Sequence, residues 1–424
     1  MTLEIAIMNT AGIALAADSA VTVKGGQKIY HSAHKLFKLS DAHPVGIMIY
    51  GNASFLDVPW ETIIKMYRNH IGNTRFDTLE AYTESFFDFL HHNDYPDLMS
   101  ECSEHSYIKH ALETEVISLG KALADIKNDL FAEYGDLYIQ DEIQDMYMEN
   151  GEAFLQNSIT DFAETKHIQG FTDDDFARLT DAYGAEIEGM IEKHFESYNL
   201  IDEWVDPIKS IAISATLKLF SRKFSGLVFA GFGEKEIYPS LYLFLVDGSI
   251  HQKVKYRNTP QSKAINHERR ASIIPLAQRD VVNNFIEGIH PGMNKLLRKN
   301  LKRHVESLHR SLVKTLDTEL SGQTNLTAIK ENLKEEILHL YHEHFNAMNR
   351  YKEEQFIDPM MAIIEHLPHE ELAEMAETLI HMTSFKKKLS ADVESVGGPV
   401  DSAVITKGDG FTWVRCKNHV VDYR

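Results

Sequence analysis

Residues 1–18 read MTLEIAIMNTAGIALAAD, and this stretch decides the fold of the 424-residue chain. Residues 3–8 and 13–18 are almost continuously apolar, and residues 9–12 between them have the polar and glycine content of a turn. We therefore predict two strands, the second running back along the first. Because neither run alternates strictly between apolar and polar residues, we expect both faces of their sheet to be covered.

The same stretch begins with a candidate catalytic residue. Removal of Met1 would leave Thr2 with its hydroxyl and a free α-amine on one residue. A hydroxyl beside an amine is a nucleophile with its own base, because an α-amine titrates near neutral pH and can accept a proton there. Asp18 stands at the end of the second apolar run and is the next candidate.

Composition limits the classes of function. The chain carries 63 acidic and 43 basic residues, a formal net charge of −20, which repels nucleic acid and anionic membranes. No apolar run reaches the roughly 20 residues that cross a bilayer, and the start lacks the positive charge of a signal peptide. The two cysteines, Cys102 and Cys416, fit a reducing compartment. We expect a cytoplasmic protein with no membrane partner and no general affinity for nucleic acid.

Patterns along the chain indicate a β-rich core with two helical insertions. Strand-like runs occur near both ends and in the middle of the chain, whereas spacings of three and four between apolar residues predict helices elsewhere. We predict a mixed α/β (α+β) protein with a discontinuous core of residues 1–72, 205–292 and 367–424. Residues 73–204 and 293–366 are the predicted helical insertions.

Several short segments, in this order along the chain, resemble proteasome β-subunits and are similar to the HslV peptidase. They are Thr2, residues 15–19 (LAADS), residues 35–37 (KLF), the strand ending at Gly51, residues 231–233, residues 239–248 and residues 397–411. The resemblance covers a little under half of the chain and leaves the two helical insertions without a counterpart. It implies a four-layer αββα sandwich that carries an N-terminal nucleophile.

The resemblance also implies roles for individual residues. Thr2 would be the nucleophile, and its α-amine would be the general base. Asp18 would pair with Lys35, whose positive charge would favour the neutral amine. The backbone N–H of Gly51 would bind the oxyanion, since a glycine lets a substrate carbonyl approach closely.

Two further residues would orient the threonine amine by hydrogen bonds. Asp392 and Ser395 keep the family's spacing of an aspartate and a serine before the last pair of strands. The loop between Ser395 and residue 401 is one residue longer than usual. Residues 269–275 lack the family's Gly-Ser-Gly segment, and Ser272 is the candidate for its serine.

The function implied by the resemblance is hydrolysis of peptide or amide bonds, with no organic cofactor and no metal. We expect a homo-oligomer, and the helical insertions offer a surface for a protein partner. The alternative is a catalytically inactive member of the same fold, used as a scaffold or a partner-binding module. Retention of Met1 in the mature protein would favour this alternative.

Two charged segments outside the core have a simpler interpretation than a binding site. Residues 293–317 are rich in lysine and arginine, and a solvated helix is favoured there over a site for phosphate or an acidic partner. His339, His342 and Glu343 share a helix face, as zinc ligands can. The His-Glu-x-x-His order is absent, so a solvated face is favoured over a metal site.

Overall fold

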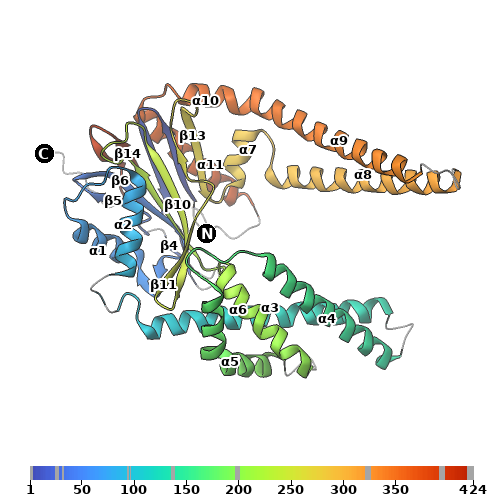
Figure 1. The fold of residues 1–424 in the computed structure, drawn as a ribbon. Helices are drawn as coiled ribbons and strands as arrows, with labels where there is room; N and C mark the ends of the chain where they lie inside the picture. Colours follow the sequence, from blue (N-terminus) through green and yellow to red (C-terminus); the bar gives the residue numbers. More distant parts are fainter. Residues whose placement is uncertain are drawn as a thin grey trace.

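The computed structural model describes residues 3–23, 28–30, 33–92, 95, 97–134, 139–195, 201–319, 326–390 and 397–417. Figure 1 shows a mixed helical and β protein. Both large sheets are antiparallel, so the predicted α+β class is confirmed.

The first sheet contains the hairpin that the opening residues predict. Its strand order is β13-β1-β2-β14-β15. Leu3 of β1 pairs with Ala277 of β13, and Glu4 pairs with Ala17 of β2. The strands are β1 (Leu3–Asn9), β2 (Gly12–Asp18), β13 (Ala271–Ala277), β14 (Val400–Thr406) and β15 (Gly410–Arg415).

The second sheet is formed by the middle of the chain. Its strand order is β11-β10-β9-β6-β5, with β12 paired to β10. The strands are β5 (Leu36–Ser40), β6 (His43–Gly51), β9 (Ser225–Gly231), β10 (Ser240–Ile250), β11 (Lys253–Asn258) and β12 (Lys263–Ala264). Two short hairpins lie outside both sheets, β3 (Val21–Val23) with β4 (Lys28–Tyr30) and β7 (Ser54–Phe55) with β8 (Val58–Pro59).

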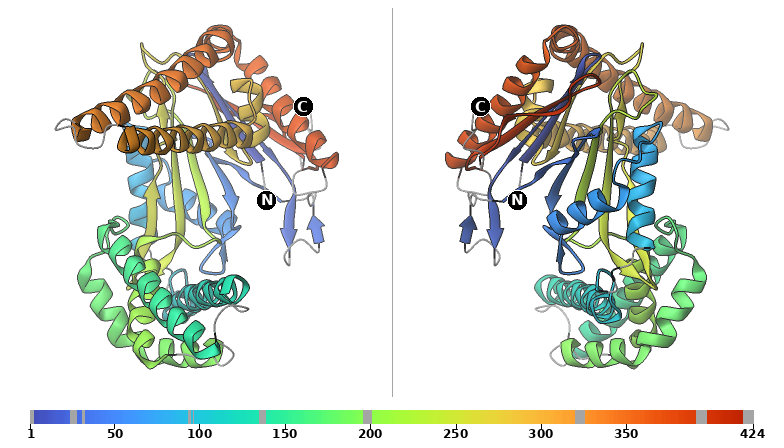
Figure 2. Two further views of the ribbon diagram at one scale, coloured as in Figure 1. Left: turned by 90° about the vertical axis from the view of Figure 1, so that its right-hand side faces the viewer. Right: turned by 90° about the vertical axis from the view of Figure 1, so that its left-hand side faces the viewer.

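The two sheets pack face to face, and helices cover their outer faces (Figures 1 and 2). Side chains alternate across a strand, so Ala6 and Met8 of β1 face the second sheet, whereas Ile5 and Ile7 face the helices. This two-sided burial explains the continuous apolar run. The first sheet is covered by α7 (Asp280–Glu287), α10 (Asp358–Ile364) and α11 (His369–Lys388), and the second by α1 (Trp60–Ile71) and α2 (Leu79–His91).

Two helical parts project from this body on the same side of the molecule (Figure 1). The larger part has its own apolar core, which also takes in Ile250 at the end of β10. It comprises α3 (Glu101–Tyr134), α4 (Gln140–Glu164), α5 (Asp173–Phe195), η2 (Asp202–Trp204) and α6 (Val205–Lys218). The other part is a helical arm of α8 (Pro291–Glu319) and α9 (Leu326–Lys352), followed by η3 (Glu353–Ile357).

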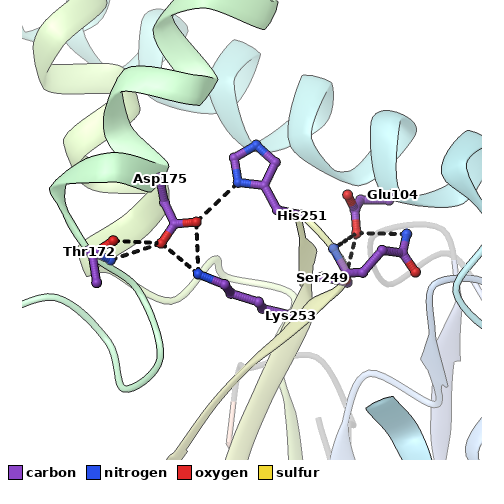
Figure 3. Close-up of polar contacts among 7 residues, drawn as sticks. Glu104, Thr172, Asp175, Ser249, His251 and Lys253 are labelled. Atoms are coloured by element: carbon purple, nitrogen blue, oxygen red, sulfur yellow. Dashed lines mark hydrogen bonds and ion pairs between the residues drawn. The ribbon is translucent and has the colours of Figure 1, made fainter. Parts of the chain in front are cut away.

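Buried carboxylates fasten the larger helical part to the β10–β11 turn (Figure 3). Asp175 of α5 accepts a hydrogen bond from Lys253 Nζ at 2.9 Å, and His251 Nδ1 lies 3.2 Å away from its carboxylate. Glu104 of α3 accepts a hydrogen bond from Ser249 Oγ at 2.6 Å. The turn is therefore held from two helices.

Strand β13 and helix α2 differ from what the sequence indicates. Strand β13 contains Pro275, a residue that argues against a strand, but β13 lies at a sheet edge, where proline is tolerated. Helix α2 lies within residues 73–204, yet its Phe86 and Phe87 pack on the second sheet.

Within the described ranges, no helix is both long enough and apolar enough to cross a membrane.

Candidate active site

One buried carboxylate, Asp18, connects four parts of the chain. Its Oδ1 accepts hydrogen bonds from Leu3 N at 3.0 Å and from Lys35 Nζ at 2.7 Å. Its Oδ2 accepts hydrogen bonds from Ala20 N at 3.2 Å and from Gly397 N at 3.0 Å. Since the side chain is 0% exposed, these four donors replace water around the charge. Asp18 therefore holds the first described residue of β1 and the Lys35 ammonium on the same oxygen.

Lys35 connects this carboxylate to the second sheet. Its side chain is only 4% exposed, and its carbonyl accepts a hydrogen bond from Ile49 N at 2.9 Å. This bond extends the β5–β6 register, in which Leu36 lies opposite Met48. Gly51 is two residues beyond Ile49 on β6, about 7 Å along the strand. Lys35 and Gly51 thus lie near the same end of the second sheet.

Gly51 occupies a backbone conformation that favours glycine. Its φ is +81°, and an added Cβ would lie 2.5 Å from the carbonyl oxygen of Phe224. The next residue, Asn52, donates its N–H to that same oxygen at 3.1 Å. Ser225 Oγ donates to the Asn52 carbonyl at 2.9 Å and accepts from Trp60 Nε1 at 2.8 Å. The chain at the end of β6 is therefore fixed by buried hydrogen bonds.

The segment before Lys35 has its own supports. Ala33 N donates to the Ser19 carbonyl at 3.3 Å, and Lys417 Nζ donates to the Ala33 carbonyl. Lys417 also forms an ion pair with Asp401 at 3.0 Å, with side chains 6% and 3% exposed. The Ser19 hydroxyl donates to the Pro399 carbonyl. These bonds tie the segment before β5 to the start of β14 and to Lys417, which follows β15, and no local sequence pattern predicts them.

Three predicted site residues, Thr2, Asp392 and Ser395, lie outside the described residues. Thr2 immediately precedes Leu3, and Ser395 is two residues before Gly397 in the sequence. Both Leu3 and Gly397 donate to Asp18. Among the predicted site residues that are described, the structure brings Asp18 and Lys35 into contact and places Gly51 near the same sheet end.

The suggested role of Ser272 is wrong. Ser272 lies in β13, opposite Met8, whereas Ala277 lies opposite Leu3. Five residues of strand, about 17 Å, separate the two pairs. Ser272 is therefore at the other end of the first sheet from the residue that follows Thr2.

The structure instead places Arg279 beside the end of β6. Burial raises the pKa of Tyr50 to about 12, and the positive charge of the nearby Arg279 opposes part of that rise. Arg279 Nη2 also donates to Gln261 Oε1 at 2.8 Å. Arg279 follows Ala277 by two residues, so it lies near the start of β1. A single arginine before a predicted helix carries no sequence signal that would have identified it.

The predicted solvated face on α9 matches what the structure shows at its histidines. His339 and Glu343 are 71% and 64% exposed and 3.9 Å apart. In the part of the chain that the structure describes, no group of three or more histidine, cysteine, aspartate or glutamate side chains could hold a metal ion.

Comparison with known proteins does not place the chain in a family. No family model matches it, and no curated protein matches it. Among solved structures it is similar to a Gly-1 mutant of Anbu from Hyphomicrobium sp. strain MC1, at 8% identity and a TM-score of 0.33, covering 98% of this chain and 85% of that one. It is also similar to Anbu, an ancestral β-subunit, from Yersinia bercovieri, at 9% identity and a TM-score of 0.27, covering 99% and 88%.

Similarities at such low TM-scores establish neither a fold nor a function. The predicted membership of the proteasome β-subunit and HslV family is therefore wrong, because neither a family model nor a curated relative supports it.

Proposed function

We propose that this chain is an amide hydrolase, acting on peptide or other amide bonds, whose nucleophile is Thr2 after removal of Met1. We also propose that the fold is a four-layer αββα sandwich built around an N-terminal nucleophile. Neither a cofactor nor a metal is required by this chemistry.

The observation that carries the proposal is the sharing of one Asp18 oxygen by Leu3 N and Lys35 Nζ, at 3.0 and 2.7 Å. Leu3 N is bonded to the carbonyl carbon of Thr2. Thr2 is therefore attached directly to a residue that shares its acceptor oxygen with the buried Lys35 ammonium. A buried lysine is costly unless its charge is paired. A positive charge at this place favours a neutral α-amine and an alkoxide on Thr2.

The proposed reaction has two steps. The Thr2 hydroxyl attacks the amide carbonyl, its α-amine accepts the proton, and the Gly51 N–H binds the developing oxyanion. The proton passes to the leaving amine, the C–N bond breaks, and an ester on Thr2 remains. Water then attacks the ester with the amine again accepting the proton, and the acid product leaves with the hydroxyl restored. Asp392 and Ser395 are the proposed residues that orient the amine.

The first test is the intact mass of the purified protein, which we expect to lack Met1. The second is labelling with a β-lactone, which a nucleophilic hydroxyl opens to form an ester, followed by peptide mapping. We expect one label on Thr2, its loss in Thr2→Ala, and slower labelling in Lys35→Ala. Thr10→Ala, in the turn after β1, and Lys38→Ala, in β5, are matched controls, and we expect both to be labelled normally.

One observation favours a second candidate, a non-catalytic scaffold. Ser272 lies at the far end of β13, so the hydroxyl suggested to support the amine is absent from that position. A mature protein that retains Met1, or a folded Met1-free protein that no β-lactone labels, would support the scaffold and overturn the hydrolase.

A further inference from the structure

The two projecting helical parts carry rows of opposite charge. On α8, Lys299, Arg303, Arg310 and Lys314 recur at intervals of four and seven residues, so they line one face of the helix. All four are exposed, and none forms an ion pair with a carboxylate of the described residues. We refer to these four residues as the basic row.

The matching feature lies on α4, which contains no lysine or arginine. Asp141, Asp145, Glu149 and Glu152 recur at intervals of three and four residues, and all four are exposed. No lysine or arginine of the described residues pairs with them. We refer to these residues as the acidic row. At 1.5 Å per residue, the acidic row is about 17 Å long and the basic row about 22 Å.

Exposed apolar side chains accompany both rows. Leu296 is 51% exposed and shares the face of the basic row, since it lies three residues before Lys299. Met148 of α4 is 42% exposed and stands beside Glu149. Complementary charge across an interface steers association and fixes register, and the neighbouring apolar side chains would gain burial in such a contact.

We propose that the basic row of α8 in one copy of this chain docks on the acidic row of α4 in a second copy. Figures 1 and 2 show α8 and α4 on separate projections, so the two rows do not meet within one molecule. Each copy supplies both rows, which makes a second copy the partner with the matching charge. The inference is independent of the chemistry proposed for Thr2.

The net charge of −20 sets the conditions under which this contact forms. At about 0.15 M salt the Debye length is about 8 Å, so repulsion between whole molecules is largely screened while charges in contact still attract. At about 1 M salt, with a Debye length of about 3 Å, the contact weakens as well. We therefore expect association to be strongest at intermediate salt.

Sedimentation velocity on the full chain tests the proposal. We expect concentration-dependent association at about 0.15 M salt. Two reversed proteins are compared with it, one with Lys299→Glu and Arg303→Glu, the other with Asp145→Lys and Glu149→Lys. Each should associate with itself at least about tenfold more weakly than the unaltered chain.

The decisive experiment mixes the two reversed proteins. In the mixture, an acidic α8 row faces a basic α4 row, and a basic α8 row faces an acidic α4 row. We therefore expect the mixture to associate as the unaltered chain does. Lys65→Glu with Lys235→Glu lowers the net charge by as much as the α8 reversal does, but elsewhere on the surface, and should leave association unchanged.

Three results would overturn the inference. The unaltered chain could stay monomeric up to ~100 μM. This result would count against the inference even if the chain binds an acidic polymer such as heparin. Reversal of either row could leave self-association intact. The mixture of reversed proteins could fail to associate although each protein keeps the far-ultraviolet circular dichroism of the unaltered chain.

Discussion

Asp18 accepts four hydrogen bonds while fully buried, and only one of its donors, Lys35, carries a formal charge. Two of the backbone donors, Leu3 N and Ala20 N, lie at the ends of the opening hairpin, and the third, Gly397 N, comes from near the other end of the chain. At the residue scale, the candidate site is thus organised by a carboxylate that need not touch a substrate. Its removal should affect folding and chemistry together, and variants are required that separate the two effects.

Asp18→Asn should destabilise the protein by about 3–5 kcal/mol, because it leaves the buried Lys35 ammonium without a counter-charge. Adding Lys35→Met should recover part of that loss, since the uncompensated charge is then gone. Urea denaturation measures both effects. The exposed pair Lys38–Asp41 supplies the control, and Asp41→Asn should leave stability unchanged. A double variant less stable than Asp18→Asn alone would contradict this account of the pair.

Gly51→Ala should cost about 1–3 kcal/mol, because φ is +81° and the new Cβ would meet the Phe224 carbonyl oxygen at 2.5 Å. Gly72→Ala is the matched control. Gly72 also has a positive φ, +53°, but nothing lies within 4 Å of an added Cβ. We expect a smaller loss in Gly72→Ala and normal β-lactone labelling, with slower labelling in Gly51→Ala. Equal losses in both variants would show that the contact with Phe224 is unimportant.

At the scale of elements, the β10–β11 turn joins the second sheet to the larger helical part. His251 and Gln252 at this turn have φ of +54° and +60°, which is unfavourable for residues other than glycine. Glu104 of α3 and Asp175 of α5 hold the turn by accepting hydrogen bonds from Gln252 N and Lys253 Nζ (Figure 3). The strained turn is therefore stabilised by elements that precede it by many residues.

Asp175 makes the stability of this junction depend on pH. Burial would raise the pKa of Asp175, but hydrogen bonds from Lys253, His251 and Thr172 lower it to about 2. The folded state therefore binds the proton less readily than the unfolded state. The resulting stability is fully present above about pH 5, is about half lost at pH 3, and disappears as pH falls below about 2.

Asp175→Asn should therefore lower the free energy of unfolding by about 1–2 kcal/mol at neutral pH, a figure reduced because Lys253 is 41% exposed. The difference between the variant and the unaltered chain should shrink between pH 5 and pH 3. Urea denaturation at each pH measures it, with the exposed neighbour Asp174→Asn as control. A difference that stays constant over this range would contradict the assigned pKa.

The sequence predicts elements well where the pattern is local. The apolar runs at residues 3–8 and 13–18 and the strand at 45–51 correspond to β1, β2 and β6, because burial on both faces leaves a continuous apolar signal. Strand β13 escapes prediction because it contains Pro275 and follows two arginines, Arg269 and Arg270, and its place depends on pairing with β1. The contact of Lys35 with Asp18 was implied only by resemblance, whereas Arg279 reaches the site through a fold that no local pattern encodes.

At the scale of the whole molecule, the body and the projecting parts differ in how they are stabilised. Three apolar clusters hold the two sheets and their helices together, and the larger helical part has a fourth. None of the four clusters includes a residue between 299 and 348. Within the arm, exposed apolar side chains remain at Leu308 and Leu340, 56% and 62% exposed.

The arm should therefore be removable without loss of the fold. Arg298 Nη2 donates to Asn349 Oδ1 at 3.1 Å, so the two helices are adjacent at this level. Because packed helix axes are about 8–10 Å apart, a linker of about four glycine and serine residues can replace residues 299–348. We expect the free energy of unfolding to change by less than about 1 kcal/mol, because the single buried side chain among the described deleted residues, Phe345, contacts Arg298, Tyr341 and His344 of the arm itself.

The same deletion separates the two proposals made for this protein. Without the basic row, sedimentation should show a monomer at concentrations where the unaltered chain associates, whereas β-lactone labelling of Thr2 should continue. A deleted protein that still associates would exclude the contact between α8 and α4. Loss of labelling in a folded, Met1-free monomer would instead mean that the chemistry at Thr2 requires the assembled state, and association would then be part of the catalytic mechanism.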